Sequence, residues 1–471
     1  MKKTKIICTI GPSCTDREVL KKMVLAGMNV ARLNFSHGSY EEHEERINLV
    51  KEVREELGMS VGLLLDTKGP EFRIKTFKDG KVNIEEGQRF TLTSRDVEGT
   101  NEIVSVACPI IMGQFKEGDK IYLNDGLLEF VVESFTDTDI VCRALNSGTV
   151  SNRKSMSFPG KVIDQEYLSE QDKRDILFGI SKDINFVAAS FVSTGEDVKS
   201  LREFLNANGG QDIAIIAKIE NRSGVDNIDE IVAYCEGVMV ARGDLGIEIP
   251  YDELPAVQKK IIRKCRLAGK IVVTATEMLE SMTVNPRPTR AEISDVANAV
   301  YDGTSAVMLS GETAVGKYPV ETVMAMSRIA EKTEENIDYK KRFRNTELKM
   351  MNSSDAMSHA VCALAIDVDT KAIVVCTKSG ATARMVSRYR CPKPIIGLTP
   401  DKKAYHKLAL SWGVMPEMCE EFRSMDVLLY HAVNCAKKTG VAKPGDHIVI
   451  TAGTTIGKSG CTDLIKYEMV Y

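Results

Sequence analysis

The sequence predicts an α/β protein: a (β/α)8 TIM barrel that carries an inserted all-β lid domain and is followed by a C-terminal α/β domain. Three observations predict this fold. Eight short apolar runs alternate with charged amphipathic segments, one gap between these runs spans about 100 residues, and a second strand–helix alternation follows the eighth run. The length of 471 residues also suits about three domains.

The eight predicted barrel strands are nearly continuous apolar runs, many of them rich in β-branched residues. Such runs are typical of parallel strands buried on both faces, and the charged segments between them have the pattern of covering helices. Eight units in a row favour a closed barrel over an open sheet. The runs cover residues 4–10, 28–34, 60–67, 184–190, 213–220, 237–244, 271–277 and 305–312.

The long gap after the third run has a different pattern. Residues 70–171 contain alternating apolar and polar residues separated by Gly, Asp and Asn turns, which predicts a small all-β domain. An insert at the carboxyl end of a barrel strand borders the active site and is well placed to act as a lid. We expect a barrel at 1–69 and 172–340, the lid domain at 70–171 and the C-terminal domain at 345–471.

The C-terminal part begins after a basic stretch at 339–351, for which we expect a solvated helix end or linker. Alternating apolar strands and amphipathic helices then predict a separate α/β domain. Its expected helices cover 355–368, 381–390 and 425–440, and its expected strands cover 371–380, 394–399, 446–453 and the last residues of the chain.

Composition excludes several classes of protein. With 43% hydrophobic and 27% charged residues the chain is unlike disordered or collagen-like sequences, and a net charge of -4 argues against bulk binding to nucleic acid or anionic membranes. No apolar run approaches the length of a membrane span or a secretory signal. The 12 cysteines form no CxxC pair and the 6 histidines are dispersed, so we expect a reduced, cytoplasmic protein whose metals are hard cations held by carboxylates.

Polar side chains gather at the predicted carboxyl ends of the barrel strands. A single polar residue there is usually a rim position, but so many converging on one mouth favour a polar active site. The set contains Arg32, Asn34, Ser36, His37, Asp66, Thr67, Lys68, Ser190, Lys218, Glu220, Arg242, Gly243, Asp244, Thr276, Glu277, Ser310 and Glu312.

The residue types in this ring indicate phosphoryl chemistry. Lys218 and Glu220 lie on the same side of one strand, and Asp244 follows the neighbouring strand. Glu220 and Asp244 could together supply two carboxylates to Mg2+, leaving positions for water and phosphate oxygens. Arg32, Arg73 and Lys218 supply the positive charge that a transferring phosphoryl group requires. Backbone N–H groups of the turn that begins at Asp244 could bind a carboxylate.

Two segments near the C-terminal end resemble phosphate loops. Residues 452–459 fit a relaxed P-loop pattern, but only a terminal strand follows them, so we reject that interpretation. Residues 377–384 follow a strand and open a helix. This pattern fits a loop that binds phosphate, and it fits equally well a helix N-cap without a ligand.

Seven segments occur in one order: CTIGPSC, MNVARLNFSHGSYEEH, LLLDTKGPEFR, IAKIENRSGVDNIDEI, GVMVARGDLGIEIP, TATEMLESM and NPRPTRAEISDVANAVYDGTSAVMLSGETAVGKYPVE. This series resembles the successive signatures of the pyruvate kinase family. The resemblance covers the barrel almost completely and the other two domains more loosely. It implies transfer of a phosphoryl group between phosphoenolpyruvate and ADP, giving pyruvate and ATP in the last step of glycolysis. It also implies Mg2+ (or Mn2+) and K+ as cofactors, a homotetramer, and a phosphorylated allosteric effector.

The resemblance implies roles residue by residue. Lys218 resembles the lysine that stabilises the transferring phosphoryl group, and Arg32 resembles the arginine that contacts the phosphate; with Thr276 they form the expected catalytic set. Expected substrate contacts are Arg32, Lys218, Gly243, Asp244 and Thr276; expected nucleotide contacts are Asn34, Phe35, Ser36, His37, Arg73 and Lys154. Expected Mg2+ ligands are Glu220 and Asp244, expected K+ ligands are Asn34, Ser36, Asp66 and Thr67, and expected effector contacts are Thr377, Lys378, Ser379, Gly380, Ala381 and Thr382, with 454–460 covering the rest of the effector.

The sequence also departs from the family pattern. Residues 153–160 read RKSMSFPG where the family usually has Lys-Gly-Val-Asn-x-Pro-Gly, which weakens the role of Lys154, and 190–194 lack a basic residue often found after that strand. Glu71 stands where potassium-dependent members carry Glu and potassium-independent members carry Lys, so we expect dependence on K+.

Two alternatives stay open at this point. A metal-dependent aldolase or lyase acting on pyruvate or phosphoenolpyruvate would use a similar barrel, although the lid and the arginines favour phosphoryl transfer. A catalytically silent sugar-phosphate sensor would use only the C-terminal domain, and the presence of Lys218, Glu220, Asp244 and Thr276 speaks against it. The effector could be fructose 1,6-bisphosphate, another sugar phosphate or AMP.

Overall fold

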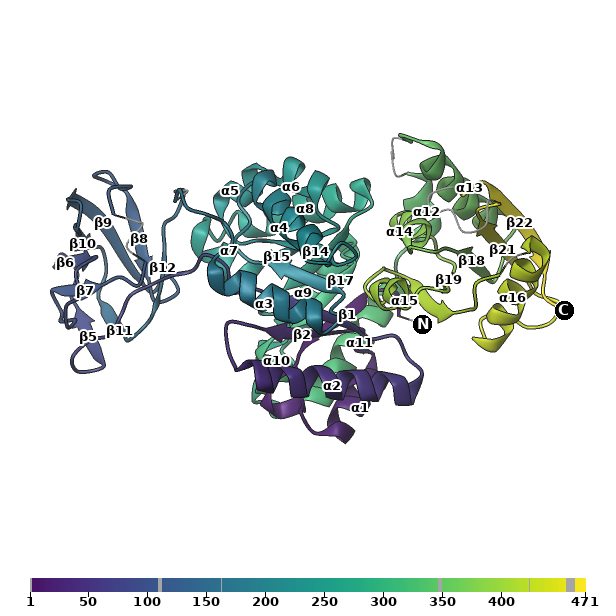
Figure 1. Cartoon of the computed structure of the whole chain (residues 1–471), viewed down its shortest axis with the longest axis horizontal. Helices are drawn as coiled ribbons and strands as arrows, with labels where there is room; N and C mark the ends of the chain where they lie inside the picture. The colour runs from purple at the N-terminus through teal and green to yellow at the C-terminus, as the bar shows by residue number, and fades with distance from the viewer. Residues whose placement is uncertain (1, 109–111, 162, 346–349, 423, 455–461) are drawn as a thin grey trace.

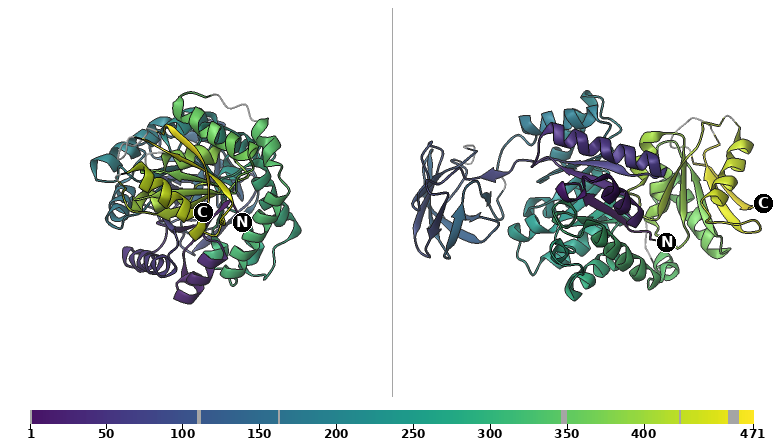
Figure 2. Two further views of the ribbon diagram at one scale, coloured as in Figure 1. Left: turned by 90° about the vertical axis from the view of Figure 1, so that its right-hand side faces the viewer. Right: turned by 90° about the horizontal axis from the view of Figure 1, so that it is seen from below.

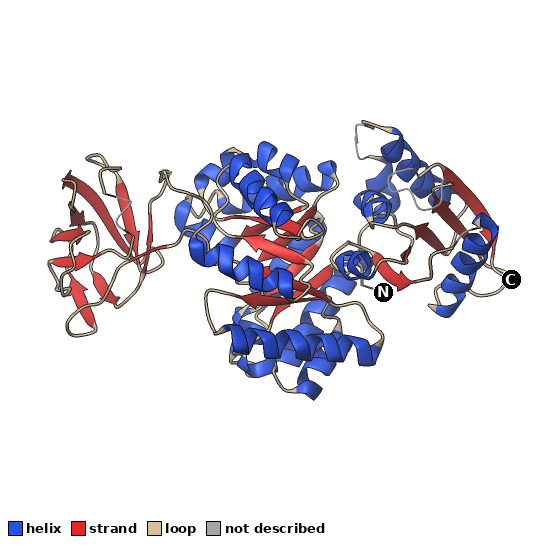
Figure 3. Cartoon of the chain, viewed as in Figure 1, coloured by secondary structure: helices blue, strands red, loops and turns tan. Residues whose placement is uncertain are grey.

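A computed structural model describes residues 2–108, 112–161, 163–345, 350–422, 424–454 and 462–471. The chain is elongated, with an all-β part, a barrel surrounded by helices, and an α/β part in a row (Figure 1). The right-hand view of Figure 2 shows the same order, with the N-terminus between the barrel and the C-terminal part. Figure 3 shows strands in all three parts and helices in the two α/β parts, while the first part consists of strands and loops.

Eight parallel strands close into a barrel, as predicted. The strands are buried along nearly their whole length because helices cover the outside of the sheet and side chains fill the interior. They are β1 (Lys5–Thr9), β2 (Val30–Asn34), β3 (Gly62–Asp66), β13 (Phe186–Ala189), β14 (Ala214–Ile219), β15 (Gly237–Ala241), β16 (Ile271–Ala275) and β17 (Ala306–Leu309). Strands β3 and β13 pair directly across the inserted segment.

The barrel helices begin at sequence signals that stabilise a first turn. Ser39, Thr194 and Thr289 each form a capping box with an acidic residue three positions later. The covering helices are α1 (Arg17–Ala26), α2 (Tyr40–Leu57), α3 (Glu170–Ser181), α4 (Gly195–Ala207), α5 (Arg222–Asp226), α6 (Ile228–Tyr234), α8 (Leu254–Ala268), α9 (Arg290–Asp302) and α11 (Pro319–Glu335).

Two predicted barrel strands were too long at their carboxyl ends. Strand β15 stops at Ala241 and helix α7 (Arg242–Glu248) follows at once, and a short helix α10 (Gly311–Ala314) follows β17. A short apolar run does not by itself distinguish the end of a strand from the start of a helix. The consequence is that Gly243 and Asp244 lie in the first turn of a helix at the barrel mouth.

The inserted part is all-β, as predicted, and leaves the barrel after β3. It has a seven-stranded sheet in the order β4-β12-β8-β9-β10-β6-β7 and a two-stranded sheet of β11 and β5, packed around Phe90 and Phe130. The strands are β4 (Phe72–Arg73), β5 (Lys81–Ile84), β6 (Arg89–Thr93), β7 (Ile103–Ser105), β8 (Lys120–Leu123), β9 (Leu128–Phe135), β10 (Asp139–Ala144), β11 (Gly148–Ser151) and β12 (Ser155–Ser157).

The C-terminal part has a five-stranded sheet in the order β20-β19-β18-β21-β22, with the last strand antiparallel. Its strands are β18 (Ala372–Cys376), β19 (Ile395–Thr399), β20 (Val414–Met418), β21 (His447–Ala452) and β22 (Leu464–Met469), and its helices are α13 (Ser353–Asp367), α14 (Ala381–Arg388), α15 (Lys402–Leu408) and α16 (Met425–Lys438). Sequence analysis missed α15 and β20. Helix α15 has only 7 residues, and edge strand β20 contains Pro416. The sequence pattern of each element is therefore too weak to identify it.

The C-terminal part sits at the amino end of the barrel strands, opposite the inserted domain (Figure 1). The Nζ of Lys5, at the start of β1, donates to the Val414 carbonyl at 2.6 Å, and the Ser60 hydroxyl donates to the Tyr405 carbonyl at 2.9 Å. The basic stretch contains helix α12 (Tyr339–Arg344), whose buried Tyr339 packs on Trp412 with ring centres 5.4 Å apart. The first six residues of this stretch therefore form a largely solvated helix, as one of the two expectations had it, but Tyr339 anchors the helix to the C-terminal part. Among the described residues, no helix is long and apolar enough to cross a membrane.

Candidate functional site

Four buried side chains meet at the carboxyl ends of β2, β3, β13 and β14. The Arg32 Nε donates to Asp66 Oδ2 at 2.6 Å, and the Lys218 Nζ donates to Asp66 Oδ1 at 3.1 Å and to Ser190 Oγ at 2.7 Å. A second branch of the Arg32 guanidinium reaches the Thr9 hydroxyl at 2.9 Å. The barrel strands therefore hold a guanidinium and an ammonium side by side on one carboxylate.

The charges of this network stabilise one another. Burial alone would lower the pKa of Lys218, but the carboxylates of Asp66 and Glu220 raise it above its ordinary value. Burial would raise the pKa of Asp66, but the cations of Arg32 and Lys218 lower it. Lys218 is therefore a fixed cation at neutral pH, suited to stabilising negative charge and unsuited to acting as a base.

Glu220 and Asp244 lie at the ends of the neighbouring strands β14 and β15. The Glu220 carboxylate accepts the Phe191 N–H at 2.6 Å and pairs with the Lys218 Nζ at 2.9 Å, while Asp244 is exposed in the first turn of α7. Burial and the negative charge of Asp244 raise the pKa of Glu220. A divalent cation would relieve this repulsion, so the donor set fits Mg2+.

The described residues contain no group of three or more His, Cys, Asp or Glu side chains placed to hold a metal. Two carboxylates, with water and substrate oxygens completing the shell, are typical of Mg2+ at phosphoryl-transfer sites. The arrangement therefore fits a metal that binds together with a phosphorylated substrate.

Thr276 lies at the mouth in a strained conformation. Its φ is +65°, which is uncommon for a β-branched residue, and its hydroxyl accepts the Gly243 N–H at 2.8 Å. The guanidinium of Arg242 stabilises this turn by donating to the Thr276 carbonyl at 2.6 Å, and it is itself fixed by Asp295 at 2.7 Å. The Thr276 hydroxyl is thereby directed at the backbone that leads into Asp244.

The predicted potassium ligands lie at or just after the carboxyl ends of the adjacent strands β2 and β3. Asn34 and Asp66 are partners in the register of β2 and β3, and the Asn34 side chain accepts the Ser36 N–H at 3.2 Å. The Thr67 hydroxyl contacts the Ala188 carbonyl at 3.3 Å. The structure thus brings Asn34, Asp66 and Thr67 close to Arg32, and Ser36 to Asn34.

Phe35 and His37, two of the predicted nucleotide contacts, differ in their surroundings. The Phe35 ring stacks on His43 of α2 with centres 4.0 Å apart, so its side chain faces the helical layer. His37 is exposed, and its carbonyl contacts the His43 Nε2 at 2.9 Å. Of these two side chains, His37 is the more exposed, and Phe35 is partly buried.

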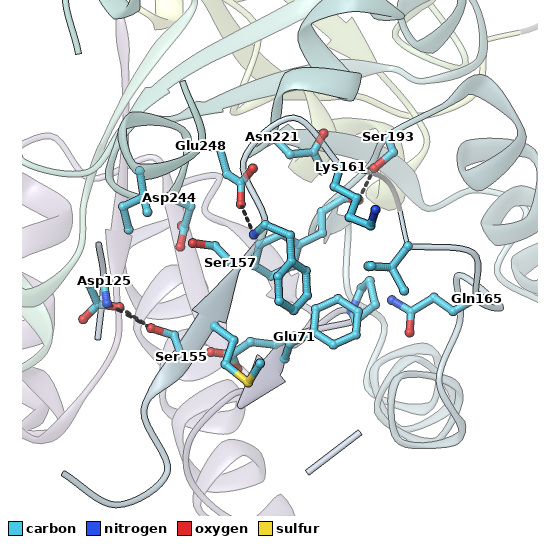
Figure 4. Close-up of a pocket in the computed structure, with 17 residues that line it drawn as sticks. Glu71, Asp125, Ser155, Ser157, Lys161, Gln165, Ser193, Asn221, Asp244 and Glu248 are labelled. Carbon is cyan, nitrogen blue, oxygen red and sulfur yellow. Dashed lines mark hydrogen bonds between the residues drawn. The ribbon is translucent and has the colours of Figure 1, made fainter. Parts of the chain in front are cut away.

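A cavity of about 150 Å3 lies between the inserted domain and the barrel mouth (Figure 4). Asp244 lines it, as do Lys161 and Glu71, and Glu71 pairs with Arg73 at 2.5 Å. Lys161 lies 2.7 Å from Asp119. Among the described lining residues the lysine is Lys161 and not the predicted Lys154, whose backbone carbonyl accepts the Ile74 N–H.

The inserted domain contacts the barrel at this cavity through Glu248 of α7. Its carboxylate accepts the Phe158 N–H at 3.3 Å (Figure 4), and burial raises its pKa to about 7. The contact links the lid to the helix that carries Asp244.

The predicted effector loop forms the start of α14. The Thr377 hydroxyl accepts the Gly380 N–H at 3.1 Å, and the hydroxyls of Thr382 and Thr462 lie 2.7 Å apart. Lys378 pairs with Glu421 at 3.3 Å. Most of the predicted covering loop, and most of the rejected P-loop, lies at 455–461, outside the described residues.

Sequence reasoning gave no role to several residues that the structure brings into the site. Ser190 bridges Lys218 and Asp66, Thr9 holds Arg32, and Arg242 holds Thr276. Ser190 and Arg242 were recognisable as polar residues at strand ends, but which partner each contacts depends on the barrel register. Lys161 carried no motif that separated it from other lid lysines.

Comparisons with known proteins identify the same family over most of the chain. The sequence matches the family described as "Pyruvate kinase, barrel domain" at residues 1–323 and the one described as "Pyruvate kinase, alpha/beta domain" at 355–466. It is 44% identical over 474 residues to a pyruvate kinase of Clostridium perfringens, covering 100% of each chain. It is 46% identical to one of Staphylococcus saprophyticus, covering 100% of this chain and 81% of that one. The structure superposes on a crystal structure of a pyruvate kinase from Cryptosporidium parvum with a TM-score of 0.95, at 38% identity and covering 100% and 96% of the two chains.

Proposed function

Because the chain belongs to the pyruvate kinase family and transfers the phosphoryl group of phosphoenolpyruvate to ADP, we propose that this chemistry takes place at the cation network of Arg32 and Lys218. The observation that carries this proposal is the pair of buried cations on Asp66, 2.6 and 3.1 Å from its two oxygens. Positive charge preorganised where water is excluded stabilises the charge on a transferring phosphoryl group.

In the proposed reaction a β-phosphate oxygen of ADP attacks the phosphorus of phosphoenolpyruvate, and the bond from phosphorus to the enol oxygen breaks. Lys218 and Arg32 stabilise the oxygens of the group in transit. The substrate carboxylate lies against the Gly243–Asp244 backbone and the Thr276 hydroxyl, which are already joined by a 2.8 Å hydrogen bond. The enolate left behind takes a proton on carbon and becomes pyruvate.

The family uses Mg2+ and K+. We propose that Glu220 and Asp244 hold Mg2+ (or Mn2+), which would supply electrostatic stabilisation of phosphate oxygens. We propose that Asn34, Ser36, Asp66 and Thr67 hold K+ beside the cation network. ADP would then lie at the lid cavity, within reach of Arg73 and of the segment from Asn34 to His37, with Lys154 or Lys161 near its phosphates.

Dependence on K+ tests the role of Glu71. We expect activity to fall at least about tenfold when K+ is replaced by tetramethylammonium, because a monovalent cation offsets carboxylate charge where no lysine is present. We expect Glu71→Lys to reduce this dependence, because it replaces a carboxylate by an ammonium that can supply the positive charge otherwise provided by K+. Initial rates of ATP formation at fixed ionic strength measure both effects. Equal rates in the two salts for the unaltered protein would contradict the potassium proposal.

We propose that the loop at the start of α14 binds a phosphorylated effector that activates the barrel. Hydroxyls and backbone N–H groups at a helix start attract phosphate, and Thr382 contributes one hydroxyl. Replacing Thr382 by Glu is expected to abolish activation by fructose 1,6-bisphosphate, another sugar phosphate or AMP, whichever activates the unaltered protein, while leaving the unactivated rate unchanged. Activation that survives Thr382→Glu would place the effector elsewhere.

The family assignment favours phosphoryl transfer over the aldolase and silent-sensor alternatives, and formation of ATP from ADP and phosphoenolpyruvate separates the three. If pyruvate condensed with an aldehyde and no ATP formed, the aldolase interpretation would replace ours. We propose in addition that the protein is cytoplasmic and that it is a homotetramer. Light scattering tests the oligomeric state, and a monomer would contradict it.

A further inference from the structure

A small cavity lies at the opposite end of the barrel from the candidate active site, where the barrel meets the C-terminal domain. Arginine and serine side chains from both parts dominate its wall, and the described residues that line it include no carboxylate. We call it the arginine cavity. Its polar lining residues are Arg266, Lys270 and Ser305 from the barrel, and Arg384, Ser387, Arg388, Arg390 and Ser411 from the C-terminal domain.

Four buried polar atoms in this wall have no hydrogen-bond partner within the described chain. They are the Nε atoms of Arg266, Arg388 and Arg390 and the Oγ of Ser411. All four can donate a hydrogen bond, and they come from two domains yet line one cavity. Buried donors are nearly always paired in folded proteins, so their concentration here points to an acceptor that belongs in the cavity.

The contacts of Arg390 show why a charged acceptor is required. Its guanidinium donates to the Gly303 carbonyl and the Ser305 hydroxyl, both at 3.0 Å, and stacks over Trp412 at 4.7 Å. Each of these partners is neutral, and the side chain is 4% exposed. Burial, reinforced by the nearby charge of Arg266, lowers the pKa of Arg390 to about 9. A buried cation without a counter-charge is costly, so an anion would stabilise it.

Of the other two arginines, Arg266 also lacks a counter-charge. The Arg266 side chain donates no hydrogen bond and forms no ion pair with any described residue, and burial and the charge of Arg342 lower its pKa. Arg388 does have a counter-charge, the buried carboxylate of Asp355 at 3.4 Å, but its Nε has no partner among the described residues. Water could accept from one or two of the free donors, but it would not offset the positive charge.

We propose that the arginine cavity binds a tetrahedral oxyanion, either inorganic phosphate or the phosphoryl group of a small metabolite. Arginine presents donors in the geometry that phosphate oxygens match, and the Ser411 hydroxyl adds a fourth donor. A wider cavity of about 270 Å3 shares Arg384 and Ile271 with it and has room for the remainder of a phosphorylated molecule. The ion joins α8 of the barrel to α14 of the C-terminal domain.

This site is distinct from the proposed effector loop, although both involve α14. The loop lies at the start of that helix, whereas Arg384 and Arg388 lie along it and at its end. An oxyanion held there fixes the C-terminal domain against the barrel and raises the stability of the folded protein in proportion to its occupancy.

Ser411→Ala provides a sharp test because this hydroxyl has no protein partner to lose. The variant should match the unaltered protein without phosphate, and its dissociation constant for phosphate at this site should rise about tenfold. Arg266→Gln should raise the unfolding midpoint without phosphate, because it removes a half-buried unpaired charge, and should abolish the part of the phosphate response that arises here. The measurement is the thermal midpoint against phosphate concentration, at constant ionic strength set with chloride.

Ser358→Ala is the matched control. The Ser358 hydroxyl is also buried without a partner, but Ser358 is not one of the residues that line the arginine cavity. Its removal should leave the phosphate response unchanged. Phosphate bound at the active site or effector loop raises the thermal midpoint of all these variants equally, so this contribution cancels when the variants are compared.

Crystals soaked in selenate locate the ion directly, with anomalous density expected between Arg266 and Arg390. A sugar monophosphate is compared with inorganic phosphate in the same assay. If it stabilises the protein more, and if Lys407→Met in the wider cavity removes this difference, the natural ligand is a phosphorylated metabolite. Selenate density absent from the cavity, or a full phosphate response in both Ser411→Ala and Arg266→Gln, would overturn the proposal.

Discussion

Replacing Lys218 by Met is expected to lower kcat for ATP formation by about 10³-fold. The side chain is fully charged at neutral pH, and its Nζ lies 3.1 Å from Asp66 and 2.9 Å from Glu220, where a transferring phosphoryl group would meet it. Charge supplied there stabilises the transition state more than the bound substrates, so the loss should fall on kcat. The KM for ADP should stay within about threefold, because nucleotide contacts come from other elements.

Lys182→Met is the matched control for this change. Lys182 is a partly buried, ion-paired lysine whose partner is Glu44, but it lies on the outer helical layer. Because Lys218→Met leaves Glu220 without its cation, the folded state of the variant must be checked by its thermal midpoint. A folded Lys218→Met protein whose kcat is within tenfold of the unaltered protein would show that Lys218 is not catalytic.

The parts of the fold that sequence predicts well are those where one physical signal dominates. The eight barrel strands are buried on both faces, so their apolar runs are nearly continuous and their number identifies the barrel. Elements that are partly buried and partly exposed are harder to predict from the sequence. Edge strand β20 carries Pro416 and Glu417 and is half-buried, and α12 combines five exposed or partly exposed residues with one anchor, Tyr339.

The candidate site follows the same rule at the level of single residues. Lys218, Glu220 and Asp66 are polar residues in apolar strands, so they stand out in sequence. Their pairing does not, because Ser190 Oγ reaches Lys218 only through the register of β13 and β14. The direction of a side chain is equally hidden: Phe35 lies in the expected segment, yet its ring packs on His43 of α2.

The arginine cavity shows a limit of a different kind. Arg384, Arg388 and Arg390 are spaced along a helix and its end, whereas Arg266 lies 118 or more residues earlier in the chain. Nothing in either segment indicates that the four side chains share one cavity. Only the docking of the C-terminal domain on the barrel brings the unpaired Nε atoms together.

Replacing Glu220 by Gln is expected to raise the Mg2+ concentration that gives half-maximal activity by about 100-fold. Altering groups that only support a metal ligand typically costs 10–100-fold in affinity, so loss of one of two proposed carboxylate ligands should cost at least as much. The amide retains an oxygen that can accept the Phe191 N–H, which is 2.6 Å from the carboxylate. The measurement is a Mg2+ titration of initial rate at saturating substrates.

The structure also predicts that this change does not unfold the protein. Burial and Asp244 raise the pKa of Glu220, so ionising it costs stability as pH rises through its folded-state pKa, and the uncharged amide removes that cost. The thermal midpoint of Glu220→Gln at pH 8 should therefore equal or exceed that of the unaltered protein. Glu248→Gln removes a half-buried carboxylate that lines the neighbouring lid cavity and should leave the Mg2+ requirement unchanged. Equal Mg2+ requirements for Glu220→Gln and Glu248→Gln would remove Glu220 from the metal site.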